Sequence, residues 1–147
     1  MPGMGAFTAG QPPEWDVERF LHGDEVDTAL ITLERNRLTF GWKCADVDAD
    51  GMALRLAPSS VTLGGLLKHL AWVEELYFQH RLAGRPVMAP FDGLDPETDW
   101  EDWPWRTAAD DTPSALRGLW VDAVHRSRAS LTDALSSGGL DQPNIPG

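Results

Sequence analysis

The segment Leu63–Ala83 constrains the fold most, because as a helix it would be apolar around most of its circumference. Ser59, Ser60 and Thr62 all offer caps before this segment, and Gly84 follows its end. At 100° per residue the consistently polar strip consists of Lys68, Glu75 and Gln79. We expect that strip to face solvent and the rest of the helix to be covered by neighbours, so the sequence predicts an all-α bundle.

Two further segments have helical spacing. Asp24 is a good cap for a helix that runs to about Lys43, and Thr112, followed by proline, starts another that ends before Gly138. The apolar stripe of the first consists of Val26, Leu30, Leu33, Arg37, Phe40 and Cys44. That of the second consists of Leu116, Trp120, Ala123, Ser127, Leu131 and Ala134. Arg37 interrupts the first stripe, and we expect its stem to lie on apolar surface while its head reaches solvent.

The connection of residues 84–111 is long for two antiparallel neighbours, which usually need about 2–8 residues. Its 28 residues can span a helix of about 21 residues, roughly 32 Å long. The last two predicted helices are therefore expected to run parallel, joined by a crossover.

The same connection carries three tryptophans in an acidic context. They are Trp100, Trp103 and Trp105. Between Asp92 and Asp111 there are eight acidic residues and one base, Arg106. We interpret the tryptophans as anchors that hold the crossover on the bundle. The alternative is a lid or wall for a small apolar or aromatic ligand.

The remaining segments have weaker patterns. Residues 1–23 are rich in Gly and Pro and are expected to form a loose arm, which Trp15 and Phe20 can anchor. Asp46–Gly51 is interpreted as a polar break with a turn. We divide the chain into an amino-terminal arm (1–23), a bundle domain (24–138) and a short tail (139–147).

Composition excludes several classes of function. The net charge of −11 disfavours nucleic acid and anionic membrane surfaces as partners. A single cysteine, Cys44, excludes an intrachain disulfide framework, and its place on an apolar stripe indicates a small hydrophobe rather than a nucleophile. Without a signal peptide pattern in Met1–Pro13 or a long apolar run, the predicted location is cytoplasmic.

The stretch LAPSSVTLGGLLKHLAWVE, residues 56–74, resembles the DinB-like superfamily, in an uncharacterised branch related to the mycothiol-dependent maleylpyruvate isomerase. Further similarity lies at Asp99-Trp100, residues 108–112, Leu119-Trp120 and residues 127–129, so that it covers roughly residues 24–136. The resemblance implies an up-down-down-up four-helix bundle and agrees with the crossover. It also implies a metal- or thiol-dependent transferase or isomerase that acts on a small molecule.

The metal site of this superfamily is matched in part. Members with such a site hold a divalent ion, Zn or Ni, with one histidine on the second helix and two on a fourth helix. His69 matches the first of these, whereas the fourth helix has no counterpart after Gly138. A naturally short chain, a gene model that stops early and an absent site are the three explanations. We expect no tight metal binding by this chain.

The other histidines do not complete a site with His69. His80 lies eleven residues further along the helix, about 16 Å away. His125 lies opposite the apolar stripe of its helix and is expected in solvent, and His22 belongs to the arm. From the residues alone, a single histidine on a buried helix is more often a hydrogen-bonded core or boundary residue than a ligand.

Two carboxylates and a glycine pair can each be interpreted as functional or as structural. Glu75 is on the polar strip and is expected in solvent, while Glu74 is interpreted as a boundary residue or the ion-pair partner of Arg81 rather than a catalytic base. Gly64-Gly65 lacks the context of a phosphate loop and is expected to permit close packing.

Two functions remain open, and the sequence does not decide whether the chain is an enzyme. The first is the metal- or thiol-dependent transferase or isomerase, with His69 as the residue carried over and a low-molecular-weight thiol as a ligand. The second is a non-catalytic helical binding or assembly module. A groove flanked by Val73, Leu76 and His80 is expected to be covered by a second copy in a homodimer.

Overall fold

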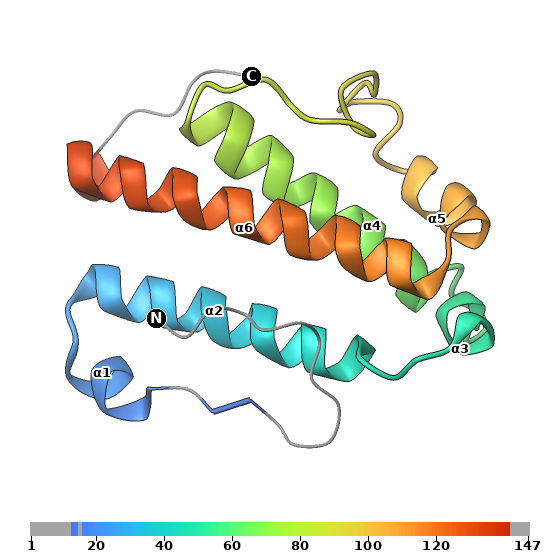
Figure 1. Cartoon of the computed structure of the whole chain (residues 1–147), viewed down its shortest axis with the longest axis horizontal. Coiled ribbons are helices and arrows are strands. Elements are labelled where there is room, and N and C mark those ends of the chain that lie inside the picture. The colour runs from blue at the N-terminus through green and yellow to red at the C-terminus, as the bar shows by residue number, and fades with distance from the viewer. Residues whose placement is uncertain (1–12, 15, 142–147) are drawn as a thin grey trace. The chain divides into compact units, whose positions relative to one another are not determined.

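The computed structural model describes residues 13–14 and 16–141, with the backbone alone at position 140. This part of the chain forms six α-helices and no strands (Figure 1). The elements are α1 (Val17–His22), α2 (Glu25–Cys44), α3 (Ala49–Ala53), α4 (Leu63–Glu74), the π-helix η1 (Glu75–Leu82), α5 (Trp103–Thr107), the 3-10 helix η2 (Ala108–Asp110), α6 (Pro113–Ser137) and the 3-10 helix η3 (Gly139–Asp141). The chain divides into two compact units, with the boundary between Val47 and Asp48.

The first unit contains α1 and α2. The predicted start of α2 is confirmed, since the side chain of Asp24 accepts a hydrogen bond from the Asp27 amide at 2.9 Å. The expectation of a loose arm is wrong for the residues of α1, because Asp16 caps this short helix. Arg19 holds it to α2 through an ion pair with Asp27, in which Nε donates at 2.7 Å. The predicted anchor Trp15 lies outside the described residues.

The expectation that the head of Arg37 reaches solvent is also wrong. Arg37 is only 4% exposed, and its guanidinium donates to the Glu34 carboxylate one turn earlier at 2.7 Å. Cys44 is fully buried, as expected for a cysteine that acts as a small hydrophobe.

The second unit is built around two long helices. The helix predicted at Leu63–Ala83 is confirmed: Thr62 caps α4 by accepting from the Gly65 amide at 3.0 Å, and Gly84 follows with a φ of 65°. Its second half, η1, has π-helical geometry that the sequence pattern did not indicate. The start of α6 is also as predicted, with Thr112 as cap and proline in the first turn.

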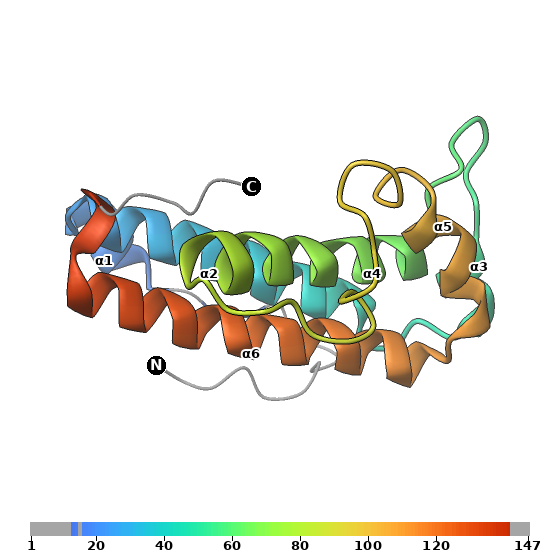
Figure 2. The same cartoon turned by 90° about the horizontal axis from the view of Figure 1, so that it is seen from above.

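Helix α6 lies beside α4 and η1 and runs in the same direction (Figures 1 and 2). Contacts advance together along both elements. Gly64 lies at Leu116, Glu75 pairs with Arg126, and Gln79 donates to Ser130. The chain returns between them through the long connection, which is the expected parallel arrangement.

The polar strip does not face solvent, so that expectation is wrong. Lys68, Glu75 and Gln79 are only 6%, 0% and 4% exposed. Each carries out its polar interactions inside the unit: Gln79 donates to Ser130 at 2.8 Å, Glu75 pairs with Arg126, and Lys68 binds the connection. The polar strip of the helix is therefore buried within the unit, whereas Val73, Leu76 and His80 on another side are half-buried.

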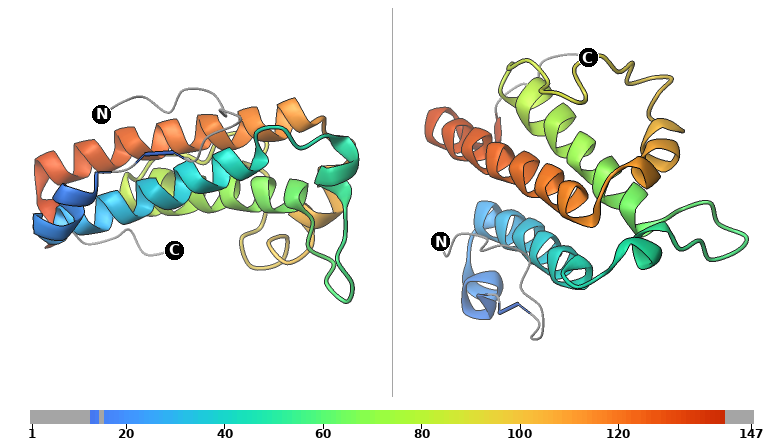
Figure 3. Two further views of the ribbon diagram at one scale, coloured as in Figure 1. Left: turned by 90° about the horizontal axis from the view of Figure 1, so that it is seen from below. Right: turned by 45° about the vertical axis from the view of Figure 1, so that its right-hand side comes forward.

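Two predicted irregular segments contain short helices. The polar break at Asp46–Gly51 is wrong in its second half, because Asp48 caps α3 by accepting from the Gly51 amide at 2.9 Å. The long connection includes α5 and η2. The loop between α3 and α4 projects away from the helices of its unit (Figure 3). Across the described residues, no helix has the length and hydropathy to cross a membrane.

Candidate functional site

The candidate site is centred on His69, on the face of α4 that the long connection covers. Gly65 lies one turn before His69 and therefore on the same face of the helix. Trp105 lies over both positions, since a Cβ atom at Gly65 would overlap its ring, and the rings of Trp105 and His69 stack with centroids 5.4 Å apart. The absence of a side chain at Gly65 lets the indole approach, as expected for close packing of the glycine pair.

Trp100 forms a second aromatic wall against the same imidazole. The centroids of Trp100 and His69 are 4.8 Å apart, with the ring planes inclined by 52°. Trp100 is 46% exposed, whereas His69 is half-buried. The site is therefore an imidazole held against two indoles, one of which presents much of its surface to solvent.

The environment of His69 favours its neutral form. Burial lowers the pKa of its imidazole below the ordinary value of 6.5, because the charged form is deprived of water. Its Nδ1 atom is buried and has no hydrogen-bond partner. A neutral imidazole has a nitrogen lone pair and can accept a proton or a hydrogen bond.

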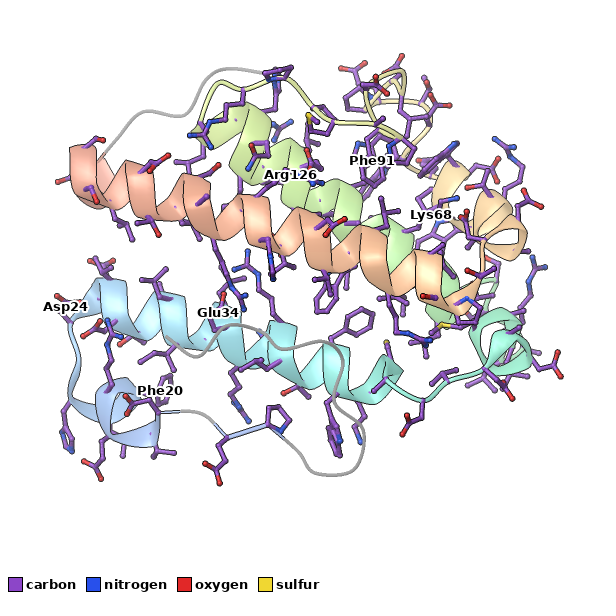
Figure 4. All side chains as sticks on the ribbon, viewed as in Figure 1. Phe20, Asp24, Glu34, Lys68, Phe91 and Arg126 are labelled. Carbon is purple, nitrogen blue, oxygen red and sulfur yellow. The ribbon has the colours of Figure 1, made fainter. Side chains whose placement is uncertain are left out.

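Lys68, the neighbour of His69, fastens the connection to the helix. Its ammonium donates to Thr107 at the hydroxyl (2.8 Å) and the carbonyl oxygen (3.2 Å), and it pairs with Asp111. Figure 4 labels Lys68 beside the short helix α5 of the connection. It also lies over the ring of Trp103, 4.5 Å from the centroid. The charge of Lys68 is thus satisfied within the fold, whereas the Nδ1 atom of the adjoining His69 has no hydrogen-bond partner.

An aromatic cluster completes the attachment. Trp72 on α4 stacks on Phe91 with centroids 6.3 Å apart, and Trp103 meets both rings edge-on at 6.0 and 5.7 Å. Phe91 is only 1% exposed. Trp103 and Trp105 pack against α4, as the interpretation of anchors requires, while the exposed Trp100 fits the alternative interpretation of a wall.

The other predicted histidines lie elsewhere. His80 is half-buried on η1, His125 is exposed as expected, and His22 is exposed beside Glu18 on α1. In the part of the chain that the structure describes, no three His, Cys, Asp or Glu residues are placed to hold a metal ion.

Glu75 is the residue that the sequence interpretation misplaced most clearly. It is fully buried, forms an ion pair with Arg126 on α6, and accepts from the Met88 amide at 3.2 Å. Its neighbour Glu74 is also buried, and the Glu74 carbonyl accepts from Ser127. Ser127, the one polar residue of the predicted stripe on α6, was the signal that polar partners cross this interface.

Comparison with known proteins gives one family. The family model described as Mycothiol-S-transferase matches residues 29–142, which is more than half of the chain. No curated protein and no solved structure matches the chain.

Proposed function

The chain belongs to the mycothiol-S-transferase family, in the DinB-like superfamily, and on that premise we propose that it joins a low-molecular-weight thiol of the mycothiol type to a small molecule at His69. The observation that carries this proposal within the site is the half-buried His69, whose lowered pKa keeps the imidazole neutral and whose Nδ1 has no internal partner. An isomerase that uses the thiol transiently would need the same group.

The chemistry asked of His69 is proton transfer from the thiol. A free thiol has a pKa of about 8.5 and is mostly protonated at neutral pH, so a base is needed to form the nucleophilic thiolate. The S–H proton passes to the imidazole, the sulfur forms a bond to an electrophilic carbon, and the leaving group departs with the electron pair of the broken bond. The imidazolium then returns its proton to the leaving group or to water.

Members of the family use a divalent metal, which would acidify a bound thiol. The described residues do not fit a closed site for such an ion, because His69 is a single donor without two further ligands beside it. We therefore expect the purified chain to hold well under one Zn or Ni ion. Elemental analysis that finds close to one ion per chain, lost in His69→Ala, would show this expectation to be wrong.

The test of the proposed function is thiol consumption. Purified protein is incubated with mycothiol and a panel of small electrophiles, with and without added Zn or Ni, and the remaining thiol is titrated. We expect His69→Gln to lower the rate by about 100-fold or more, the usual contribution of a general base. His125→Gln, at an exposed position of α6, is the matched control. A rate equal to that of the uncatalysed reaction under all conditions would exclude the proposal.

A second candidate is a non-catalytic binding or assembly module. The observation in its favour is the projecting loop between α3 and α4, where Leu54 and Leu56 are 60% and 72% exposed. The thiol assay separates the two, since a module of this kind would leave the thiol unchanged. For the topology we propose the up-down-down-up order of the superfamily, and the parallel course of α4 and α6 supports it.

A further inference from the structure

We infer that the small molecule bound at this site is a planar aromatic compound, neutral or positively charged, that stacks on the exposed ring of Trp100. The inference rests on the proposed function, because it names the class of substrate for the same site.

The exposed ring of Trp100 lies beside the imidazole of His69. A single exposed tryptophan is ordinary on a protein surface. Here, however, the ring of Trp100 lies 4.8 Å from an imidazole whose Nδ1 atom is buried without a partner. A flat molecule stacked on Trp100 would therefore lie close to the imidazole on which the proposed function rests.

Hydrogen bonds order the turn that carries Trp100 before any ligand binds. The side chain of Asp99 accepts from the Asp95 amide at 2.9 Å, and the Asp99 carbonyl accepts from the Trp103 amide at 2.9 Å. Hydrogen bonds from residues before and after Trp100 thus stabilise the turn that carries it. Trp103, at the end of the turn, packs in the aromatic cluster. A fixed indole loses little conformational entropy when it binds a flat ligand.

Trp100 differs from the other two tryptophans of the connection in the exposure of its ring. Trp103 has the Lys68 ammonium over its ring, and Trp105 lies on Gly65 and His69. Both are half-buried, whereas Trp100 is 46% exposed. A planar ligand therefore finds its stacking surface at Trp100.

The segment around Trp100 is strongly acidic. The segment 95–102 contains Asp95, Glu97, Asp99, Glu101 and Asp102 and no basic residue. The nearest base in sequence, Arg106, is paired with Asp102 at 2.8 Å. Carboxylates that precede and follow an indole in the sequence repel an anionic ligand and strengthen the attraction of a cation to the ring face. This charge pattern selects neutral and cationic aromatic molecules.

The experiment is a titration of the full chain with three probes, followed by calorimetry and by the indole N–H signals in NMR spectra. The probes are 1-methylquinolinium, a planar cation; 2-naphthoate, a planar anion of similar size; and tetramethylammonium, a cation without a ring. We expect 1-methylquinolinium to bind about tenfold more tightly than 2-naphthoate, with a ratio that falls as salt is added. Tetramethylammonium should bind more weakly than the planar cation.

Variants locate the site. Trp100→Leu should weaken binding of 1-methylquinolinium about fivefold or more, the typical loss of one stacking partner, and Trp100→Phe should weaken it less. Tyr77→Leu is the matched control, because Tyr77 is 50% exposed on η1. Glu97→Gln with Glu101→Gln should reduce the preference for the cation, whereas the equal charge change at Glu14 and Asp122 should not.

Equal affinity for the planar anion, or binding that Trp100→Leu and Trp100→Phe leave unchanged, would overturn the inference, as would the absence of binding by the wild-type chain. The outcome is separable from that of the proposed function. Thiol transfer to non-aromatic electrophiles without binding of 1-methylquinolinium would contradict only the proposed substrate class. Binding at Trp100 without any thiol transfer would contradict only the proposed function.

Discussion

At His69 the imidazole has exchanged much of its solvent for two indole rings, and the resulting fall of its pKa links folding to pH. The unfolded chain, with a histidine pKa near 6.5, binds the proton more readily than the folded chain. Stability attributable to this residue is therefore lost as pH falls below about 6.5 towards the lowered pKa of the folded state. As pH is lowered from 7.5 to 5.5, we expect the melting temperature of the wild type to fall more than that of His69→Phe.

Comparison of the two proteins at each pH cancels the acid titration of the carboxylates that they share. His125→Phe, at an exposed position of α6, supplies the baseline in the same series. A constant difference between His69→Phe and the wild type across the whole range would contradict the linkage.

Glu75 is a fully buried carboxylate with two partners from different segments, Arg126 on α6 and the amide of Met88 in the connection. Removal of the carboxylate leaves a guanidinium and an amide without an acceptor. Because the Arg126 side chain is 32% exposed and can recover some water, we expect Glu75→Ala to lower the free energy of unfolding by about 3 kcal/mol, the low end for a broken buried pair.

Chemical denaturation measures this loss. The exposed pair Asp102–Arg106 is the matched control, with side chains 70% and 61% exposed, and Asp102→Asn should cost less than about 1 kcal/mol. A double variant that replaces Glu75 and Arg126 by apolar residues should regain part of the loss. Equal costs at Glu75 and Asp102 would mean that the buried pair contributes little.

Among the elements, the long connection depends on two aromatic side chains for its attachment. Trp103 packs in the cluster with Trp72 and Phe91, and Trp105 lies over Gly65 and His69. Replacement of both by Ala should open residues 90–106 to protease while circular dichroism shows nearly unchanged helix content, because α4 and α6 keep their own contacts. Limited proteolysis with mass spectrometry reports the cleavage sites.

The control is Trp100→Ala, which removes a largely exposed indole and should increase cleavage less. An unchanged cleavage pattern in the double variant would show that Trp103 and Trp105 are not anchors.

The long helices were predictable because their boundaries are set locally. Asp24, Thr62 and Thr112 are caps whose hydrogen bonds involve residues three positions away. The short helices α1 and α3 were missed, since Gly- and Pro-rich or turn-like composition outweighed a single capping aspartate. At five or six residues, neither shows a helical period.

The interior polar groups and the site could not be read from a helical wheel. A wheel assigns Lys68, Glu75 and Gln79 to solvent, but their partners lie 39 to 51 residues away, at Thr107, Arg126 and Ser130. His69 was found through the family resemblance, and the aromatic residues of the connection were recognised as a group. That Trp100 and Trp105 meet at His69 follows from the folded connection alone.

On the scale of the whole molecule, a second copy of the chain is expected to cover the side of α4 and η1 that carries Val73, Leu76 and His80. All three are half-buried in the single chain. Burial of apolar surface contributes about 25 cal/mol per Å², so a few hundred Å² represents several kcal/mol that a second copy could supply. We expect a symmetric homodimer through this face, since an isologous contact uses the same patch twice.

Sedimentation velocity at micromolar concentration tests the dimer. Leu76→Glu places a charge in the expected interface and should shift the chain to the monomer, because a carboxylate buried without a partner is costly. Val61→Glu, on the projecting loop where Val61 is already 41% exposed, should leave the association unchanged. If the wild-type chain sediments as a monomer and binds no hydrophobic dye, the face is already covered within one chain. The apolar stripe of Leu63–Ala83 would then describe the interior of a monomer rather than an interface.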